Sequence, residues 1–167
     1  ATGGNARGTR AIDISLSRTS ATQVCTGGNS IVIGNECQAL GNTSVAIGYQ
    51  TGANSAESVA IGAYSTATGG ATAVGRQASA SQVNAVAIGY ICLASGGSSF
   101  SAGAGNTSSG NGAASLGQQT LADRSGMFAF CNGRFSANGD AQRARFVLRC
   151  KTTTNTAVEM ALDGATT

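Results

Sequence analysis

The sequence predicts an all-β protein whose chain winds into a parallel β-roll with coils of fourteen residues. Three observations predict it. A five-residue phrase, small–apolar–small–apolar–Gly, recurs through residues 30–140. Its copies start fourteen residues apart, with a single step of thirteen. The residues between copies are mostly Gly, Asn, Ser, Thr and Ala, which favour turns. A short fixed period of this kind indicates a stacked solenoid.

Eight copies of the phrase are present. The clearest occupy residues 30–34, 44–48, 58–62, 71–75 and 85–89, and weaker ones occupy 99–103, 113–117 and 127–131. Seven of the eight end in glycine, which indicates a positive φ or a close backbone approach at that position. We expect these glycines to define the fold: Gly34, Gly48, Gly62, Gly75, Gly89, Gly103 and Gly117.

Each phrase has two unlike faces, because side chains alternate along a strand. The fourth position forms an apolar ladder of Ile33, Ile47, Ile61, Val74, Ile88, Ala102, Leu116 and Phe130. The first, third and fifth positions hold mainly Ser, Ala or Gly. A return strand should include the small residue at the tenth position: Ala39, Ala53, Ala67, Ala80, Ala94, Ser108, Ala122 and Ser136.

A roll this narrow should be stable only in an oligomer. Two large apolar residues per coil do not offset the ordering of fourteen residues, at about 1–2 kcal/mol each. We expect the small face, which includes Ala60, to pack against other rolls in an obligate homotrimer. A wide monomeric β-helix is the alternative, but it needs a period near twenty. An ice-binding solenoid needs a uniform Thr column, and the eighth position is mixed: Cys37, Thr51, Ser65, Ala78, Cys92, Asn106, Thr120 and Arg134.

Charged residues are unevenly distributed along the chain and are rare in its middle part. The net charge is +3, from 10 Lys and Arg against 7 Asp and Glu, and residues 30–112 carry only Glu36, Glu57 and Arg76. We therefore expect a lead-in with a short strand (1–29), an eight-unit shaft (30–140) and the start of a β-rich domain (141–167). Alternation in 143–151 and 158–163 predicts a hairpin there. Its basic residues form either a solvated face balanced by acids or a contact for acidic polysaccharide on a host surface: Arg143, Arg145, Arg149 and Lys151.

We identify no catalytic, cofactor-binding or metal-binding residues. The chain has no His, so Ser–His–Asp and Cys–His arrangements are excluded. Asp123 and Asp140 could lie one coil apart as a carboxylate pair, but turn residues are the expected role. The tyrosines Tyr49, Tyr64 and Tyr90 should pack between neighbouring coils, with sugar stacking as the alternative. No apolar run is long enough to span a bilayer, so membrane insertion is not expected.

The chain has an odd number of cysteines and no Cys-x-x-Cys motif. The cysteines are Cys25, Cys37, Cys92, Cys131 and Cys150. A closed disulfide framework within the chain and a zinc site are therefore not expected. We expect small buried apolar residues, with a bridge between chains as the alternative. Unpaired thiols fit assembly in a reducing cytosol.

The repeat resembles the head repeats of YadA-type trimeric autotransporter adhesins. Residues 44–48 and 58–62, both Ser-Val-Ala-Ile-Gly, carry the resemblance, which covers about 30–140. It implies a trimer of left-handed parallel β-rolls. The flanks resemble phage tail-fibre-type proteins instead, at residues 5–14 and 139–164.

Together these features predict a structural segment of a phage virion, a tail fibre or similar appendage, that supports host attachment without catalysis. We expect it to be part of a longer polypeptide. The expected partners are two further copies of the chain, other virion proteins and a host cell-surface glycan, with no nucleic acid and no cofactor. The first alternative is the head of a bacterial trimeric autotransporter adhesin on the bacterial cell surface. The second is an enzyme-bearing tailspike.

Overall fold

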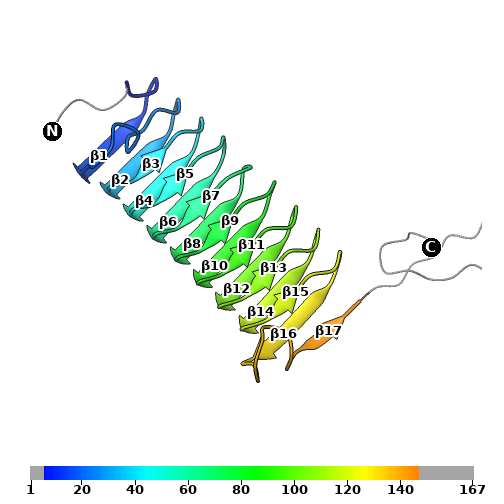
Figure 1. Ribbon diagram of the computed structural model, residues 1–167. Coiled ribbons are helices and arrows are strands. Elements are labelled where there is room, and N and C mark those ends of the chain that lie inside the picture. The colour runs from blue at the N-terminus through cyan, green and yellow to red at the C-terminus, as the bar shows by residue number, and fades with distance from the viewer. Residues whose placement is uncertain (1–5, 147–167) are drawn as a thin grey trace, which may run out of the picture.

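The computed structural model describes residues 6–146, and these residues form a parallel β-roll (Figure 1). Each regular coil contains a five-residue strand, a turn, a two-residue strand and a second turn. The longer strands make a ten-stranded sheet and the two-residue strands a seven-stranded sheet. The predicted all-β class with parallel coils of fourteen residues is confirmed.

The strands of the first sheet follow one another in chain order, and all but the last pair in parallel. They are β1 (Ile12–Ser17), β2 (Ile31–Asn35), β4 (Val45–Tyr49), β6 (Val59–Ala63), β8 (Thr72–Arg76), β10 (Val86–Tyr90), β12 (Phe100–Ala104), β14 (Ala114–Gln118), β16 (Phe128–Asn132) and the antiparallel β17 (Arg143–Arg145). The second sheet consists of β3 (Gln38–Ala39), β5 (Gly52–Ala53), β7 (Thr66–Ala67), β9 (Ser79–Ala80), β11 (Leu93–Ala94), β13 (Thr107–Ser108) and β15 (Leu121–Ala122).

Small side chains fill the interior, which reverses the orientation that we predicted for the two faces. The first, third, eighth and tenth positions of each coil point inward. In one coil these are Ser58, Ala60, Ser65 and Ala67, each with no exposed surface. The prediction that Ala60 faces a neighbouring roll is therefore wrong. The large residues at the second and fourth positions point outward, because an interior closed by one five-residue and one two-residue strand has room only for small groups.

The glycine at the end of each phrase is required for two reasons. Gly34, Gly48 and Gly62 have φ values of 132°, 132° and 124°, which side chains rarely allow. A Cβ on Gly62 would also lie 2.0 Å from the carbonyl oxygen of Gly75 in the next coil. The glycine column therefore lets neighbouring backbones approach closely.

The coil that is one residue short does not disturb the register. Ile61 still pairs with Val74 and Gly62 with Gly75. The missing residue is lost from the turn between β7 and β8, where Gly69 and Gly70 have φ values of 69° and 66°. Two consecutive residues with positive φ form a tight turn, so the deletion is absorbed outside both sheets.

The predicted lead-in forms a further rung of the roll. Ile12 of β1 pairs with Ile31, and Ile14 pairs with Ile33, so β1 continues both outward-facing columns. Ile31 follows Ile12 by nineteen sequence positions, five more than the spacing of regular coils. The connection returns to the roll at Cys25, which forms an isolated parallel bridge with Ala39.

The C-terminal end of the roll is closed differently from our prediction. Ser136, expected in a return strand, is exposed in a turn, so that prediction is wrong. Arg134 stands at the eighth position and is exposed, whereas every other coil buries its eighth side chain. The chain reverses instead, and β17 pairs antiparallel with β16. The Gln142 amide covers the edge of β15 by accepting from the Leu121 N–H (2.9 Å) and donating to its carbonyl oxygen (2.7 Å).

The predicted C-terminal hairpin extends beyond the described part of the chain. Within that part, Arg143 and Arg145 are exposed and Ala144 packs against a buried cluster containing Ala129. The second strand, residues 158–163, and the basic residues Arg149 and Lys151 lie outside the described residues.

Replacing Ala60 by Leu should destabilise the folded roll. The added atoms have no space between the two sheets, and overpacking typically costs 1–3 kcal/mol. Thermal unfolding followed by circular dichroism measures the effect. Ile61→Leu is the matched control, because that neighbouring side chain points outward. An unchanged melting temperature for Ala60→Leu would contradict the inward orientation.

Replacing Gly62 by Ala should lower the free energy of unfolding by roughly 3 kcal/mol, because backbone strain and a steric clash act together. Gly112→Ala isolates the backbone contribution. Gly112 has a φ of 63°, but no atom lies within 4 Å of its added Cβ. We expect a loss of about 1 kcal/mol for this control. Equal losses in denaturant titrations would show that the close approach is unimportant.

Candidate functional site

The largest candidate site is the apolar outer surface of the ten-stranded sheet, which we call the outer ladder. It consists of the side chains at the second and fourth positions of the repeated phrase, on the nine parallel strands of this sheet from β1 to β16. Successive rungs lie directly opposite one another: Val45 pairs with Val59 and Ile47 with Ile61. The fourth-position column that we predicted, from Ile33 to Phe130, is thus continuous in the structure. Thr72 is the only polar residue in either column, and none is charged.

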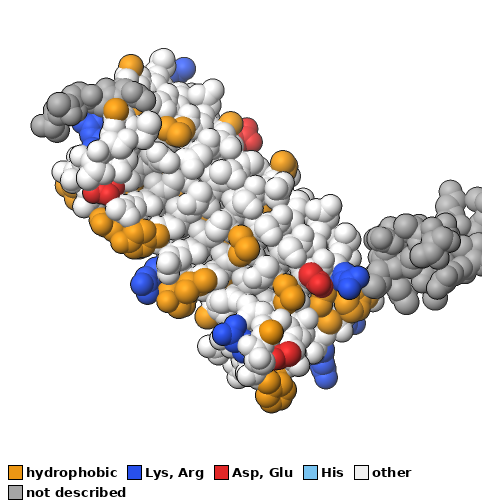
Figure 2. Space-filling model, viewed as in Figure 1, with side chains coloured by type: hydrophobic (Ala, Val, Ile, Leu, Met, Phe, Trp, Pro, Cys, Tyr) orange, Lys and Arg blue, Asp and Glu red, His pale blue; other side chains and the backbone are white. Residues whose placement is uncertain are grey.

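Much of the outer ladder is accessible in the single chain. Ile14 is 54% exposed, Ile88 41% and Phe130 52%. Figure 2 shows apolar side chains in separate patches along the length of the face in view, with charged groups beside several of them. Nine parallel strands at about 4.8 Å make this surface about 38 Å long. A contiguous exposed apolar surface of this extent marks an interaction site.

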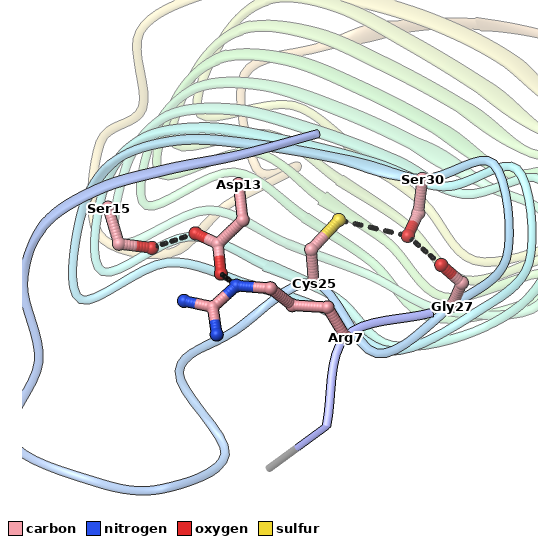
Figure 3. Close-up of polar contacts among 6 residues, drawn as sticks. All are labelled: Arg7, Asp13, Ser15, Cys25, Gly27 and Ser30. Atoms are coloured by element: carbon pink, nitrogen blue, oxygen red, sulfur yellow. Dashed lines mark hydrogen bonds and ion pairs between the residues drawn. The ribbon is translucent and has the colours of Figure 1, made fainter. Parts of the chain in front are cut away.

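Polar groups close the N-terminal end of the roll (Figure 3). Asp13 occupies the inward-facing position of β1 that pairs with Val32 in the next rung. Its carboxylate contacts the Arg7 guanidinium at 2.7 Å as an ion pair and accepts a hydrogen bond from Ser15. The Asp13 side chain is almost fully buried, so Arg7 balances a charge at the first rung of the interior.

At the C-terminal end of the roll, two arginines lie next to the last rung of the outer ladder. Arg145 pairs with Phe128 and Arg143 with Phe130, so these basic residues stand beside the last apolar rung. The structure thus places two of the four basic residues singled out in the sequence at the boundary of the apolar surface. Their contact with a glycan stays a prediction.

The tyrosines pack between neighbouring coils, as expected. The rings of Tyr49 and Tyr64 meet edge to face with centroids 5.3 Å apart. Arg76 lies over the ring of Tyr90 at 5.2 Å. Each ring nevertheless keeps substantial exposed surface, and Tyr64 is 48% exposed.

The four described cysteines are free thiols buried inside the roll: Cys25, Cys37, Cys92 and Cys131. The Cys37 thiol donates to the carbonyl oxygen of Gly48 (3.1 Å), and the Cys92 thiol donates to that of Gly103 (3.2 Å). Burial raises the pKa of the Cys25 thiol, which lies 3.0 Å from the Ser30 hydroxyl. The expected buried role is confirmed for these four, and Cys150 lies outside the described residues.

The two aspartates considered for catalysis have structural partners. Asp140 accepts hydrogen bonds from the N–H groups of Ala137 (2.8 Å), Ser136 (2.6 Å) and Phe135 (2.9 Å). Asp123 faces Arg124 at 3.7 Å. Within residues 6–146, no three His, Cys, Asp or Glu side chains gather as a metal site. The same residues include no helix with the length and apolarity to cross a membrane.

Comparison with known families defines the repeat. Residues 26–51, 39–65 and 69–90 match the model of the YadA head domain repeat. This part of the roll is similar to YadA head domain repeats. The resemblance seen in the sequence is thereby confirmed, and rolls of this adhesive, structural family form trimers. The chain has no significant match among curated proteins or solved structures.

The roll continues beyond the matched residues. The matches to the YadA head repeat end at residue 90, but β10, β12, β14 and β16 keep the same parallel register. In this later part, Asn106 occupies the inward-facing eighth position of its coil. Its amide donates to the carbonyl oxygens of Ala102 (2.6 Å) and Gly117 (2.8 Å) and accepts from the Thr120 N–H (2.8 Å). A longer polar side chain is therefore accommodated because its hydrogen bonds are satisfied.

Asp140→Asn should lower the melting temperature at neutral pH. Three backbone N–H groups, with Ala137 first, hold the pKa of Asp140 below its ordinary value. The contribution of the charged carboxylate is thus complete above the unfolded pKa of about 3.9 and is lost as the pH falls through the lower folded pKa. Melting curves of both proteins between pH 7 and pH 2.5 should converge at the acid end. Identical curves at pH 7 would rule out this role.

Proposed function

We propose that this chain is one protomer of a homotrimeric, adhesin-like fibre segment in which three outer ladders meet along the fibre axis. The observation that carries the proposal is the outer ladder itself, an uncharged apolar surface running from β1 to β16. The interior of each roll buries mainly Ala, Ser, Thr and Cys. Burying large apolar side chains supplies most of the folding free energy. In this roll those side chains lie on the outer ladder, so burying them requires contact between chains.

A three-fold axis parallel to the roll fits the composition of the outer ladder. Its N-terminal rungs carry Ile and Val, whereas its last rungs carry Phe128 and Phe130. Parallel rolls at equal height place residues of equal size at each level of the axis. Cyclic symmetry also closes the assembly, so each chain buries its whole ladder. The YadA head repeats in the roll support the number three.

We propose further that the fibre belongs to a phage virion and supports host attachment mechanically, without catalysis. The flanking sequences support this assignment, and so do the four buried free thiols, which suit assembly in a reducing cytosol. Other virion proteins would be its neighbours. The alternative is the head of a bacterial surface adhesin, which the YadA repeats support equally. An enzyme-bearing tailspike is the second alternative.

The complete gene distinguishes these contexts. Neighbouring genes for virion proteins are expected for a phage fibre. A signal peptide together with an outer-membrane anchor in the same reading frame would contradict the virion proposal and support the bacterial adhesin. Cleavage of host capsule by the purified protein would support the tailspike.

Ile61→Asp should prevent trimer formation, because it places three like charges around the axis at one level. Light scattering after size-exclusion chromatography at micromolar concentration measures the mass directly. The wild-type protein should have three times the mass of one chain. A monomeric wild-type protein would overturn the proposed architecture.

Leu93→Asp is the matched control for Ile61→Asp. Leu93 is also an exposed apolar residue, but it lies on the seven-stranded sheet, away from the outer ladder. The control should stay trimeric. Loss of the trimer in both variants would mean that the interface is not confined to the outer ladder.

A further inference from the structure

A polar pocket at the N-terminal end of the seven-stranded sheet has no part in the proposed trimer interface. Its volume is about 250 Å³. The side chains that matter for its chemistry are an acid and several amides: Gln23, Glu36, Gln38, Gln50 and Asn54. We call this the amide pocket. Gly52 of β5 and Thr66 of β7 also line it.

The amides hold one another in place. The Gln50 side-chain amide donates to the Glu36 carboxylate at 2.5 Å, across neighbouring coils. The Gln38 amide donates to the Asn54 amide oxygen at 3.0 Å. Each pair fixes one end of its side chains and leaves other donor and acceptor positions of the amides for a ligand. The polar groups are therefore ordered before anything binds.

Gly52 is present for a reason other than backbone conformation. Its φ lies outside the left-handed region, unlike that of the glycines ending each phrase. The other coils carry a side chain at this ninth position: Gln38, Thr66, Ser79, Leu93, Thr107 and Leu121. A Cβ on Gly52 would lie 3.2–3.4 Å from the amide groups of Asn54 and Gln38. The missing side chain thus keeps the space between Asn54 and Gln38 open.

One wall of the amide pocket comes from the five extra residues of the first coil. Gln23 and Thr22 in that segment line the pocket. The Gln23 amide oxygen accepts from the N–H groups of Thr19 (2.6 Å) and Ser20 (3.0 Å), which orders the segment locally. The insertion, Gly52 and the paired amides are three separate departures from the repeat, and all occur at one place.

We propose that the amide pocket binds a neutral oligosaccharide. Amides both donate and accept hydrogen bonds, as sugar hydroxyls do. Glu36 is the only charged side chain that lines the pocket, so an acidic sugar would be repelled. Tyr64 follows Glu36 and Gln50 in the same column of turn positions, one coil further on, and its ring is about half exposed.

The location suits recognition by a fibre. The pocket opens on the seven-stranded sheet, whereas the outer ladder belongs to the ten-stranded sheet. A trimer formed through the outer ladders would therefore carry three copies of the pocket. Simultaneous occupation of several sites strengthens attachment to a surface that displays many identical glycans. Binding to one pocket does not itself depend on trimer formation.

The test is binding of the intact protein to immobilised oligosaccharides. The panel contains neutral hexose and N-acetylhexosamine oligosaccharides, with sialylated and uronic-acid oligosaccharides in parallel. We expect binding to at least one neutral member, and at least tenfold weaker binding by Gly52→Thr and Gln50→Met. Gly52→Thr restores a residue typical of this position in other coils, so it should fold and unfold like the wild-type protein.

Matched controls are available in neighbouring coils. Ser79→Thr places the same residue at the ninth position of another coil, and Gln77→Met repeats the amide loss at the equivalent turn position, where Gln77 and Gln50 have φ values of 57° and 50°. Both controls should bind like the wild-type protein. No binding to any neutral oligosaccharide at millimolar concentration, or unchanged binding by Gly52→Thr, overturns the proposal. Binding to acidic members alone overturns it too. Light scattering on the same samples reports the trimer separately.

Discussion

The narrow space between the two sheets of each coil is the constraint on which the rest of this structure depends. A coil made from one five-residue and one two-residue strand encloses only small groups, so Ala60 and its equivalents are buried and Ile61 is turned outward. Gly62 and its equivalents let neighbouring coils approach closely near the ends of the five-residue strands. The roll therefore carries its large apolar side chains on its surface. This surface is the one that we propose to pack against other copies of the chain, and repetition makes it straight and continuous.

The period of fourteen and the terminal glycines were sufficient to predict the roll, because both follow directly from backbone geometry. The direction of the faces was not predictable from alternation, which is the same whichever side is buried. The usual expectation that Ile47 is buried and Ala46 exposed fails in an unusually thin coil. The mixed eighth position contained the missing signal, since Asn106 and Thr120 donate hydrogen bonds to backbone carbonyl oxygens inside the roll.

Features that depend on contacts between distant residues could not be predicted from one repeat. The turn at Asp140 replaced an expected strand because a single carboxylate collects three backbone N–H groups. The amide pocket depends on an insertion before Val24 and a glycine in β5, which have no visible connection in the sequence. Such irregular positions distinguish one coil from another in a roll that is otherwise uniform, and they lie where specific recognition can be added without altering the stack.

The tight turn at Gly69 and Gly70 has a consequence for how this architecture changes over time. Because a lost residue leaves both sheets in register, genetic slippage within the turns is tolerated. Gain or loss of a whole repeat should also preserve every contact type, and it would change the length in steps of about 4.8 Å. The number of coils therefore sets the length of the roll. Selection can adjust the distance between what lies at its two ends while the cross-section stays constant.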